Sequence, residues 1–161
     1  MDEIIDNALV QKLCTEVREK LSYVKKRIVA LESLKENYME SNRLLSEGMD
    51  ELDKAKREYV NAKEQFKTAL VGNLGNKKQE SLAKIIDSIT KQEIHIQTEV
   101  LPDNINNIRR IESRIEYYKT QTDYVDSLSN LGQLERMSIA ELEKYNRNLE
   151  QLLIELQNEK L

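Results

Sequence analysis

A seven-residue apolar repeat runs through the first half of the chain and constrains its fold more than any other feature. A repeat held this long keeps one stripe facing a partner only when the helix joins a left-handed supercoil. We therefore expect one long coiled-coil helix over residues 1–71. Its seam consists of nine consecutive heptad positions: Val10, Val17, Val24, Leu31, Tyr38, Leu45, Leu52, Tyr59 and Phe66.

The composition is typical of long helices. The 161 residues include four glycines and one proline, and 34% are Asp, Glu, Lys or Arg. So few glycines and prolines cannot punctuate the many short strands of an all-β fold or the repeated crossovers of an α/β fold. The hydrophobic share of 39% argues against a disordered chain. We therefore expect an all-α protein.

A cluster of turn-forming residues follows the seam. Residues 71–76 read Val-Gly-Asn-Leu-Gly-Asn and carry no charge. Glycine or asparagine directly after a helix favours a helix C-cap. The cluster predicts a turn over residues 72–77 and an antiparallel hairpin whose returning helix covers residues 78–101. The apolar stripe of that returning helix is Leu82, Ile85, Ile86, Ile89, Ile96 and Val100.

Pro102 predicts an interruption of the returning arm. The residue before a proline is biased away from helical backbone, so we expect a break or kink at Leu101. The helix then continues over residues 102–132, where Asp103 or Asn104 is placed to cap the restart. The apolar stripe changes phase just before Leu101, as an interruption there requires.

The last segment, residues 133–161, is predicted to form a C-terminal zipper helix that begins with a capping box at Ser138 and Glu141. Because the returning arm is longer than the first helix, the end of a chain whose hairpin is in register runs past the N-terminus or folds back on it. The apolar stripe of this segment is then expected to have no partner in the chain. We therefore expect the stripe to bind an external partner. It consists of Leu142, Tyr145, Leu149, Leu152 and Leu156. The predicted fold is a long antiparallel helical hairpin with a kink near Pro102 and a terminal zipper.

No set of residues predicts catalysis, a metal or a cofactor. His95 is the single histidine and Cys14 the single cysteine, and a zinc site needs three or four converging ligands. Cys14 falls on the apolar stripe, where a small buried side chain is expected rather than a nucleophile. The glycines near Lys77 lack the Walker A spacing and follow a helix instead of a strand. We expect no enzyme, no cofactor and no small-molecule substrate.

Charge disfavours nucleic acid and membranes as partners. The formal net charge is −4. Lys25-Lys26-Arg27 with Arg18 and Lys20 is the densest basic cluster, and it would suit phosphate, an anionic membrane or an acidic partner. Arg109-Arg110 with Arg114 is a second, smaller cluster. Neither cluster has the interleaved aromatic residues of a base-stacking surface. The chain shows no signal peptide and no transmembrane segment, so we expect an intracellular protein, cytoplasmic or nuclear.

These patterns predict a structural role. The leading hypothesis is a non-enzymatic scaffold subunit that joins other helical subunits in a homo- or hetero-oligomeric coiled coil. The alternative is a soluble helical chaperone or adaptor that holds a client protein. Two long helices joined by a short turn are similar in architecture to export chaperones and to the rod-shaped subunits of kinetochore or tethering complexes. The similarity extends to no motif, so it assigns no residue.

Overall fold

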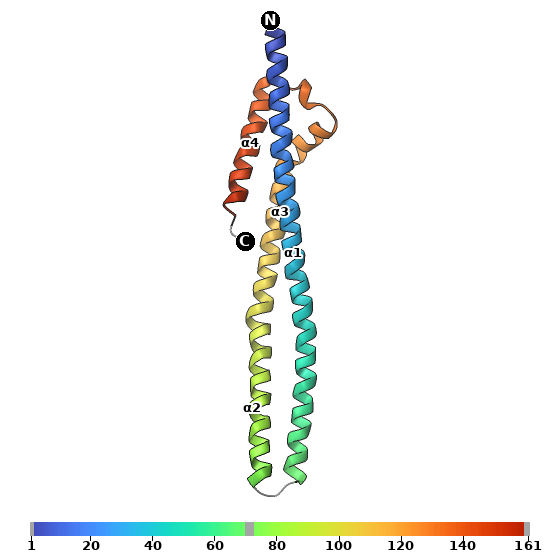
Figure 1. Cartoon of the computed structure of the whole chain (residues 1–161), viewed down its shortest axis with the longest axis vertical. Helices are drawn as coiled ribbons and strands as arrows, with labels where there is room; N and C mark the ends of the chain where they lie inside the picture. The colour runs from blue at the N-terminus through green and yellow to red at the C-terminus, as the bar shows by residue number, and fades with distance from the viewer. Residues whose placement is uncertain (1, 70–72, 160–161) are drawn as a thin grey trace. The chain divides into compact units, whose positions relative to one another are not determined.

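The computed structural model describes residues 2–69 and 73–159, with side chains for residues 6–65 and 77–159. The described residues are almost entirely helical and include no strand, which confirms the all-α fold (Figure 1). The elements, in chain order, are α1 (Asp2–Ala69), α2 (Asn73–His95), the π-helical segment η1 (Ile96–Val100), α3 (Leu101–Asn130), the 3-10 turn η2 (Leu134–Arg136) and α4 (Ile139–Gln157).

The chain divides into two compact units. Residues 1–36 and 109–161 form the first, which we call the bundle unit because α1, α3 and α4 all contribute to it. Residues 37–108 form the second, which we call the hairpin unit because α1 is paired there with a returning arm of α2, η1 and the start of α3.

Polar pairs define the direction of the two arms in the hairpin unit. The Asn104 side-chain amide donates a hydrogen bond of 2.7 Å to Asn42 Oδ1. Further along α1, Lys56 Nζ lies 3.6 Å from a carboxylate oxygen of Glu93. As the residue numbers rise on α1, those of the partners fall, so the arms are antiparallel and the predicted hairpin is confirmed.

The connection between the arms is shorter than expected. The sequence predicts a turn over residues 72–77, but α2 already begins at Asn73, so residues 73–77 are helical. Residues 70–72, and the side chain of the seam residue Phe66, lie outside the described residues.

Pro102 does not break the helix. The five residues before α3 form a π-helical turn, and the Leu101 amide donates to the carbonyl oxygen of Ile96, five residues back. Proline lacks an N–H group and its ring clashes with the carbonyl four residues earlier, and a wider turn is one way to relieve both problems. The wider turn also accounts for the phase change of the apolar stripe. Asn104 bonds Asn42 instead of capping a restart.

The segment between α3 and α4 reverses the chain. Gly132 has a φ of 67°, and the Gln133 amide donates to the Leu128 carbonyl at 2.8 Å, which is the pattern of a Schellman C-cap. Leu134, in η2, is fully buried and anchors the reversal. Ser138 then caps α4 by accepting a hydrogen bond of 3.2 Å from the Glu141 amide, as the capping box predicts.

The bundle unit has a closed apolar core. Val17 and Val24 on the α1 seam are fully buried, and α3 and α4 supply the other walls. The buried side chains from these helices and η2 are Leu13, Cys14, Val17, Leu21, Val24, Ile28, Ile111, Ile115, Tyr118, Val125, Leu128, Leu134, Leu142, Leu149, Leu152 and Leu156. Among the described residues, no helix is long and apolar enough to cross a membrane.

Two glycines yield opposite stability predictions. A side chain at Gly132 is strained by the positive φ, whereas a methyl group at Gly48, inside α1, would meet no neighbouring side chain within 4 Å. We expect Gly132→Ala to lower the free energy of unfolding by about 1 kcal/mol and Gly48→Ala to raise it by about 1 kcal/mol. Urea unfolding followed by circular dichroism measures both changes, and a reversed sign at either position would contradict the backbone described.

Candidate helix-interaction surface

The leucine stripe of α4 lies inside the bundle unit. Leu142 and Leu149 are at most 1% exposed, and the two later leucines of the stripe are also buried. Tyr145 is half-buried, and its ring meets Tyr124 edge-on with centroids 6.1 Å apart. The expectation that this stripe needs an external partner is therefore wrong. The reversal at Gly132 folds α4 back along α1 and α3, which supply an internal partner.

Contacts on both sides of α4 define its direction. Against α3, Tyr117 donates to Glu155 at 3.1 Å, and Tyr118 donates to Glu159 at 2.6 Å. Against α1, the Asn146 amide donates to Glu16 at 3.0 Å. As residue numbers rise along α4, those of its partners on α3 fall, from Tyr145 with Tyr124 to Glu155 with Tyr117, so α4 runs antiparallel to α3. The C-terminal end of α4 lies against residues of α1 that follow Glu16, so α4 runs parallel to α1.

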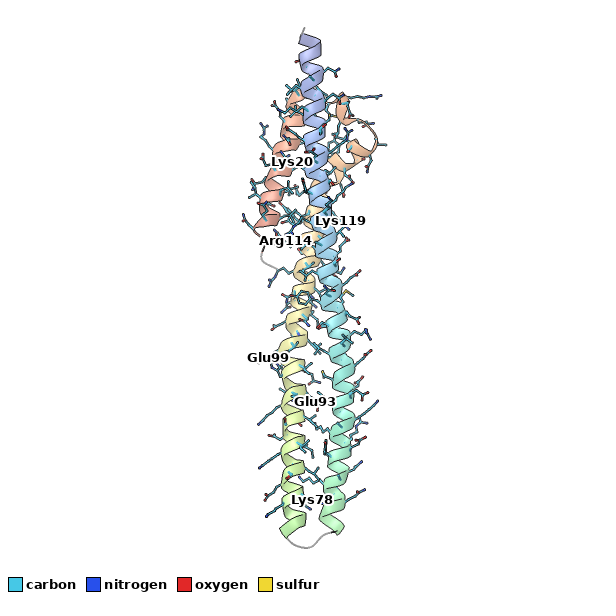
Figure 2. The ribbon with its side chains drawn as sticks, viewed as in Figure 1. Lys20, Lys78, Glu93, Glu99, Arg114 and Lys119 are labelled. Atoms are coloured by element: carbon cyan, nitrogen blue, oxygen red, sulfur yellow. The ribbon has the colours of Figure 1, made fainter. Side chains whose placement is uncertain are left out.

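A partly buried ion pair fastens the segment at the end of α4 to α3. Arg114, labelled in Figure 2, donates from Nη2 to Glu159 Oε2 at 2.8 Å. Its Nε lies 2.6 Å from the other carboxylate oxygen. The Tyr118 hydroxyl donates to the same carboxylate. Arg114 also lies over the rings of Tyr117 and Tyr118, with centroids 5.3 and 5.4 Å away. We call Arg114, Tyr118 and Glu159 the α4 clamp.

The clamp shifts the pKa values of its members in ways that its geometry explains. Burial alone would raise the pKa of Glu159, but hydrogen bonds from Arg114 and Tyr118, together with the Arg114 charge, hold that pKa below its ordinary value. Burial, followed by the hydrogen bond to the carboxylate, raises the pKa of Tyr118 to about 12. Both shifts favour a deprotonated Glu159 and a protonated Tyr118, so the hydrogen bond between them is stable and the two groups are not matched to exchange a proton.

Sequence patterns do not predict the α4 clamp, because Arg114 and Glu159 are 45 residues apart in the chain. The same holds for Arg18, whose Nη1 donates to Glu135 at 2.6 Å and ties α1 to η2. A side-chain hydrogen bond from Arg18 lowers the pKa of Glu135. Both carboxylates therefore stabilise the bundle unit in their charged form.

In the hairpin unit, the apolar seam is only partly covered. Ile89 is the one described side chain in this unit that is buried. The α1 seam residues Tyr38, Leu45, Leu52 and Tyr59 are half-buried, because one partner helix shields them on one side only. The large apolar side chains that this unit leaves exposed are Met39, Leu44, Val60, Ile85, Ile94 and Ile105.

Polar pairs interrupt the same seam. The Asn42–Asn104 hydrogen bond and the Lys56–Glu93 ion pair both cross it. Glu93, labelled in Figure 2, keeps one buried carboxylate oxygen without a hydrogen-bond partner among the described residues. Paired polar groups within a seam cost stability but select one register, as buried asparagines do in coiled coils.

The described residues hold no group of three or more His, Cys, Asp or Glu side chains arranged to bind a metal. His95 is exposed, and its Nδ1 lies 2.8 Å from Glu99 on the next turn of the helix. Cys14 is fully buried among apolar side chains, and burial raises the pKa of its thiol. A buried thiol with a raised pKa is a poor nucleophile.

The comparisons with known proteins found no match: no protein-family model, no curated protein and no solved structure is similar to this chain. What the described surface offers is the partly covered apolar seam of the hairpin unit, crossed by two polar pairs.

Burial of the α4 stripe predicts the behaviour of its leucines. We expect Leu149→Ala to lower the free energy of unfolding of the bundle unit by about 3 kcal/mol, because it leaves a cavity in a closed core. The exposed neighbour Ile154→Ala should cost less than about 1 kcal/mol. Urea unfolding measures the costs, and sedimentation velocity should show an unchanged oligomeric state for Leu149→Ala. A dissociated but equally stable variant would instead mark the stripe as an interface.

The α4 clamp predicts loss of stability in acid. The folded-state pKa of Glu159 is lowered, so its contribution is complete above the unfolded pKa of about 4.3 and disappears as the pH falls through the lower folded value. We expect Glu159→Gln to lower the free energy of unfolding by about 2 kcal/mol at pH 7 and to flatten its decline below pH ~4. Glu143→Gln, at an exposed position on α4, is the control. Equal pH profiles for wild type and Glu159→Gln would contradict the clamp.

Proposed function

We propose that this protein is a non-enzymatic structural subunit that assembles with other helical chains through its hairpin unit. The observation that carries the proposal is the half-covered seam of that unit, in which Ile89 is the one described side chain that is buried. The partner helices belong to a second copy of the chain or to another subunit. Cys14, a buried free thiol, suits a reducing setting inside the cell.

The energetics of the hairpin unit support this assignment. Fully burying a large aliphatic side chain contributes about 1.5–3 kcal/mol, so each half-exposed one leaves about 1 kcal/mol unused. Met39 is 50% exposed and Val60 is 40% exposed. These two residues occupy the same heptad position of α1, three heptads apart, and so share one face of a coiled-coil helix. A docked helix would cover that face and the flank of the seam together.

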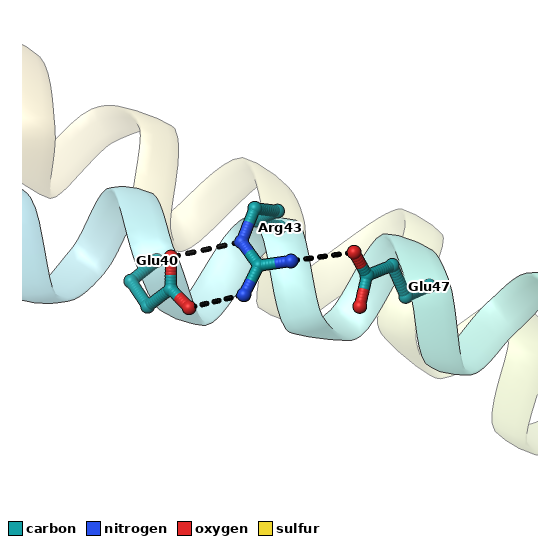
Figure 3. Close-up of polar contacts among 3 residues, drawn as sticks. All are labelled: Glu40, Arg43 and Glu47. Atoms are coloured by element: carbon teal, nitrogen blue, oxygen red, sulfur yellow. Dashed lines mark hydrogen bonds and ion pairs between the residues drawn. The ribbon is translucent and has the colours of Figure 1, made fainter.

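The charged side chains that flank Met39 and Val60 on α1 are paired with one another. Arg43 pairs with Glu40 and Glu47 one turn away on either side, and the three side chains form a charged ridge (Figure 3). Hydrogen bonding to Arg43 lowers the pKa of Glu40. Arg57 likewise pairs with Asp53, at 2.6 Å. Because these charges pair within one helix, they favour contact with solvent and do not need oppositely charged groups from a partner helix.

Sedimentation equilibrium of the full chain between about 1 and 100 μM tests the proposal, since helical assemblies of this kind associate in the micromolar range or tighter. We expect concentration-dependent association, and we expect Met39→Lys with Val60→Lys to weaken it at least tenfold. Both residues are exposed, so circular dichroism should show unchanged helix content. The matched control is Val29→Lys with Leu131→Lys, which places the same charges at exposed apolar positions of the bundle unit.

A chain that stays monomeric over this range, with no difference between the two double variants, would contradict assembly with itself. The second candidate, a helical chaperone or adaptor, is favoured by the same exposed apolar side chains. It predicts a stable monomer or dimer that binds and releases an unfolded client. A structural subunit instead keeps a fixed stoichiometry through gel filtration.

A further inference from the structure

The bundle unit carries an apolar groove between α1 and α4 that no part of the described chain fills. Its main hollow has a volume of about 450 Å³, with walls from Tyr23, Lys26 and Arg27 on α1 and Leu153, Leu156 and Gln157 on α4. A second hollow of about 200 Å³ shares Arg27 and Leu156 and continues along α1 to Leu34. Glu159 also lines this hollow, and its carboxylate is paired with Arg114. The two hollows therefore form one groove that follows α1 from Tyr23 to Leu34.

The shape of the groove suits a helix. Residues 23–34 of α1 extend over about 17 Å, the length of three helical turns. The two walls are helices that run in the same direction, and a third helix laid between them would extend the three-helix bundle to four. Leu156 is buried at the base of the groove, whereas Tyr23 is 59% exposed at its edge.

The charges along the groove select the partner. Three of the five basic residues clustered near Lys25 are satisfied within the bundle unit: Arg18 pairs with Glu135, Lys20 donates to Asn146, and Lys25 pairs with Asp126. The two that remain are those that line the groove. Among the described residues, Arg27 makes no ion pair, and Lys26 meets only the ring of Tyr23, with its ammonium 5.8 Å from the centroid.

We propose that this groove is the docking site for an acidic amphipathic helix of a partner protein. The apolar stripe of that helix lies along Leu153, Leu156 and the Tyr23 ring, and its flanking Glu or Asp side chains pair with Lys26 and Arg27. Unpaired cations beside an apolar surface attract a partner that supplies both the carboxylates and the apolar stripe. The groove lies in the bundle unit, so this docking goes beyond the assembly proposed for the hairpin unit.

Selection from a displayed library of helical peptides tests the proposal. The peptides carry leucines along one face and a random choice of Glu, Lys, Gln or Ala at the flanking positions, and the bait is the purified full chain. We expect the selected peptides to be acidic at the flanks. Their dissociation constants are then measured by fluorescence anisotropy with synthetic labelled peptides.

Variants locate the binding site. We expect Lys26→Glu with Arg27→Glu to raise the dissociation constant at least tenfold, and Tyr23→Ala to raise it about fivefold. The matched control, Arg109→Glu with Arg110→Glu, reverses two adjacent exposed basic residues on α3 and should change it less than twofold. All of these positions are exposed, and circular dichroism verifies that each variant stays folded.

Four outcomes would overturn the proposal. They are the selection of neutral or basic peptides, the selection of none, acidic peptides indifferent to the Lys26 and Arg27 reversal, and peptides whose binding is lost in Met39→Lys with Val60→Lys. The last outcome would place the peptides on the hairpin unit, so it would leave the proposed assembly standing while removing this site. Binding of oleate that depends on Lys26 and Arg27, with no peptide selected, would identify a fatty anion as the occupant.

Discussion

Both units depend on the burial of one apolar stripe along α1. Where α3 and α4 both cover the stripe, Val17 and Val24 lose all contact with solvent. Where a single returning arm covers it, Leu45 and Leu52 stay half-buried. The side chains are similar in size and spacing, so the number of helices around them decides how much each contributes. In the bundle unit the middle of the stripe is fully buried, and in the hairpin unit the stripe is only half-buried.

Polar contacts serve different purposes in the two units. In the bundle unit, Arg18 and Arg114 fasten η2 and the end of α4 to neighbouring helices, at the places where the chain reverses or stops. In the hairpin unit, the Asn42–Asn104 pair and the Lys56–Glu93 pair cross the seam itself. There they replace apolar contacts, and their contribution is to select one register of the two arms. A fixed register would also present one defined surface to a partner helix.

The two proposed docking surfaces differ in their chemistry. The charges on the outer face of the hairpin unit are paired within α1, so its exposed Met39 and Val60 offer apolar contact without a charge preference. The groove of the bundle unit combines an apolar base with the unpaired Lys26 and Arg27. The two proposals therefore assign partner helices of different chemistry to the two units.

Local patterns explain why much of the fold was predictable and much of the candidate site was not. The heptad repeat, the Ser138 cap and the phase change of the apolar stripe before Pro102 depend on residues within a few turns of one another, so the sequence shows them directly. The basic cluster near Lys25 was visible as a composition feature. Which of its members remain unpaired was not, because the partners Glu135, Asn146 and Asp126 follow more than 100 residues later.

The sequence by itself determined an all-α chain, an antiparallel hairpin and an amphipathic last helix, because the spacing of apolar side chains dictates which helix faces must be buried. The tertiary structure alone decided what covers them. It turned α4 back along α1 and α3, so that the leucine stripe from Leu142 to Leu156 became core instead of interface. It also placed a π-helical turn directly before Pro102, so that the arm continues as a helix. The spacing of apolar side chains shows that a helix face must be buried, but only the path of the chain determines whether another part of the same chain buries it.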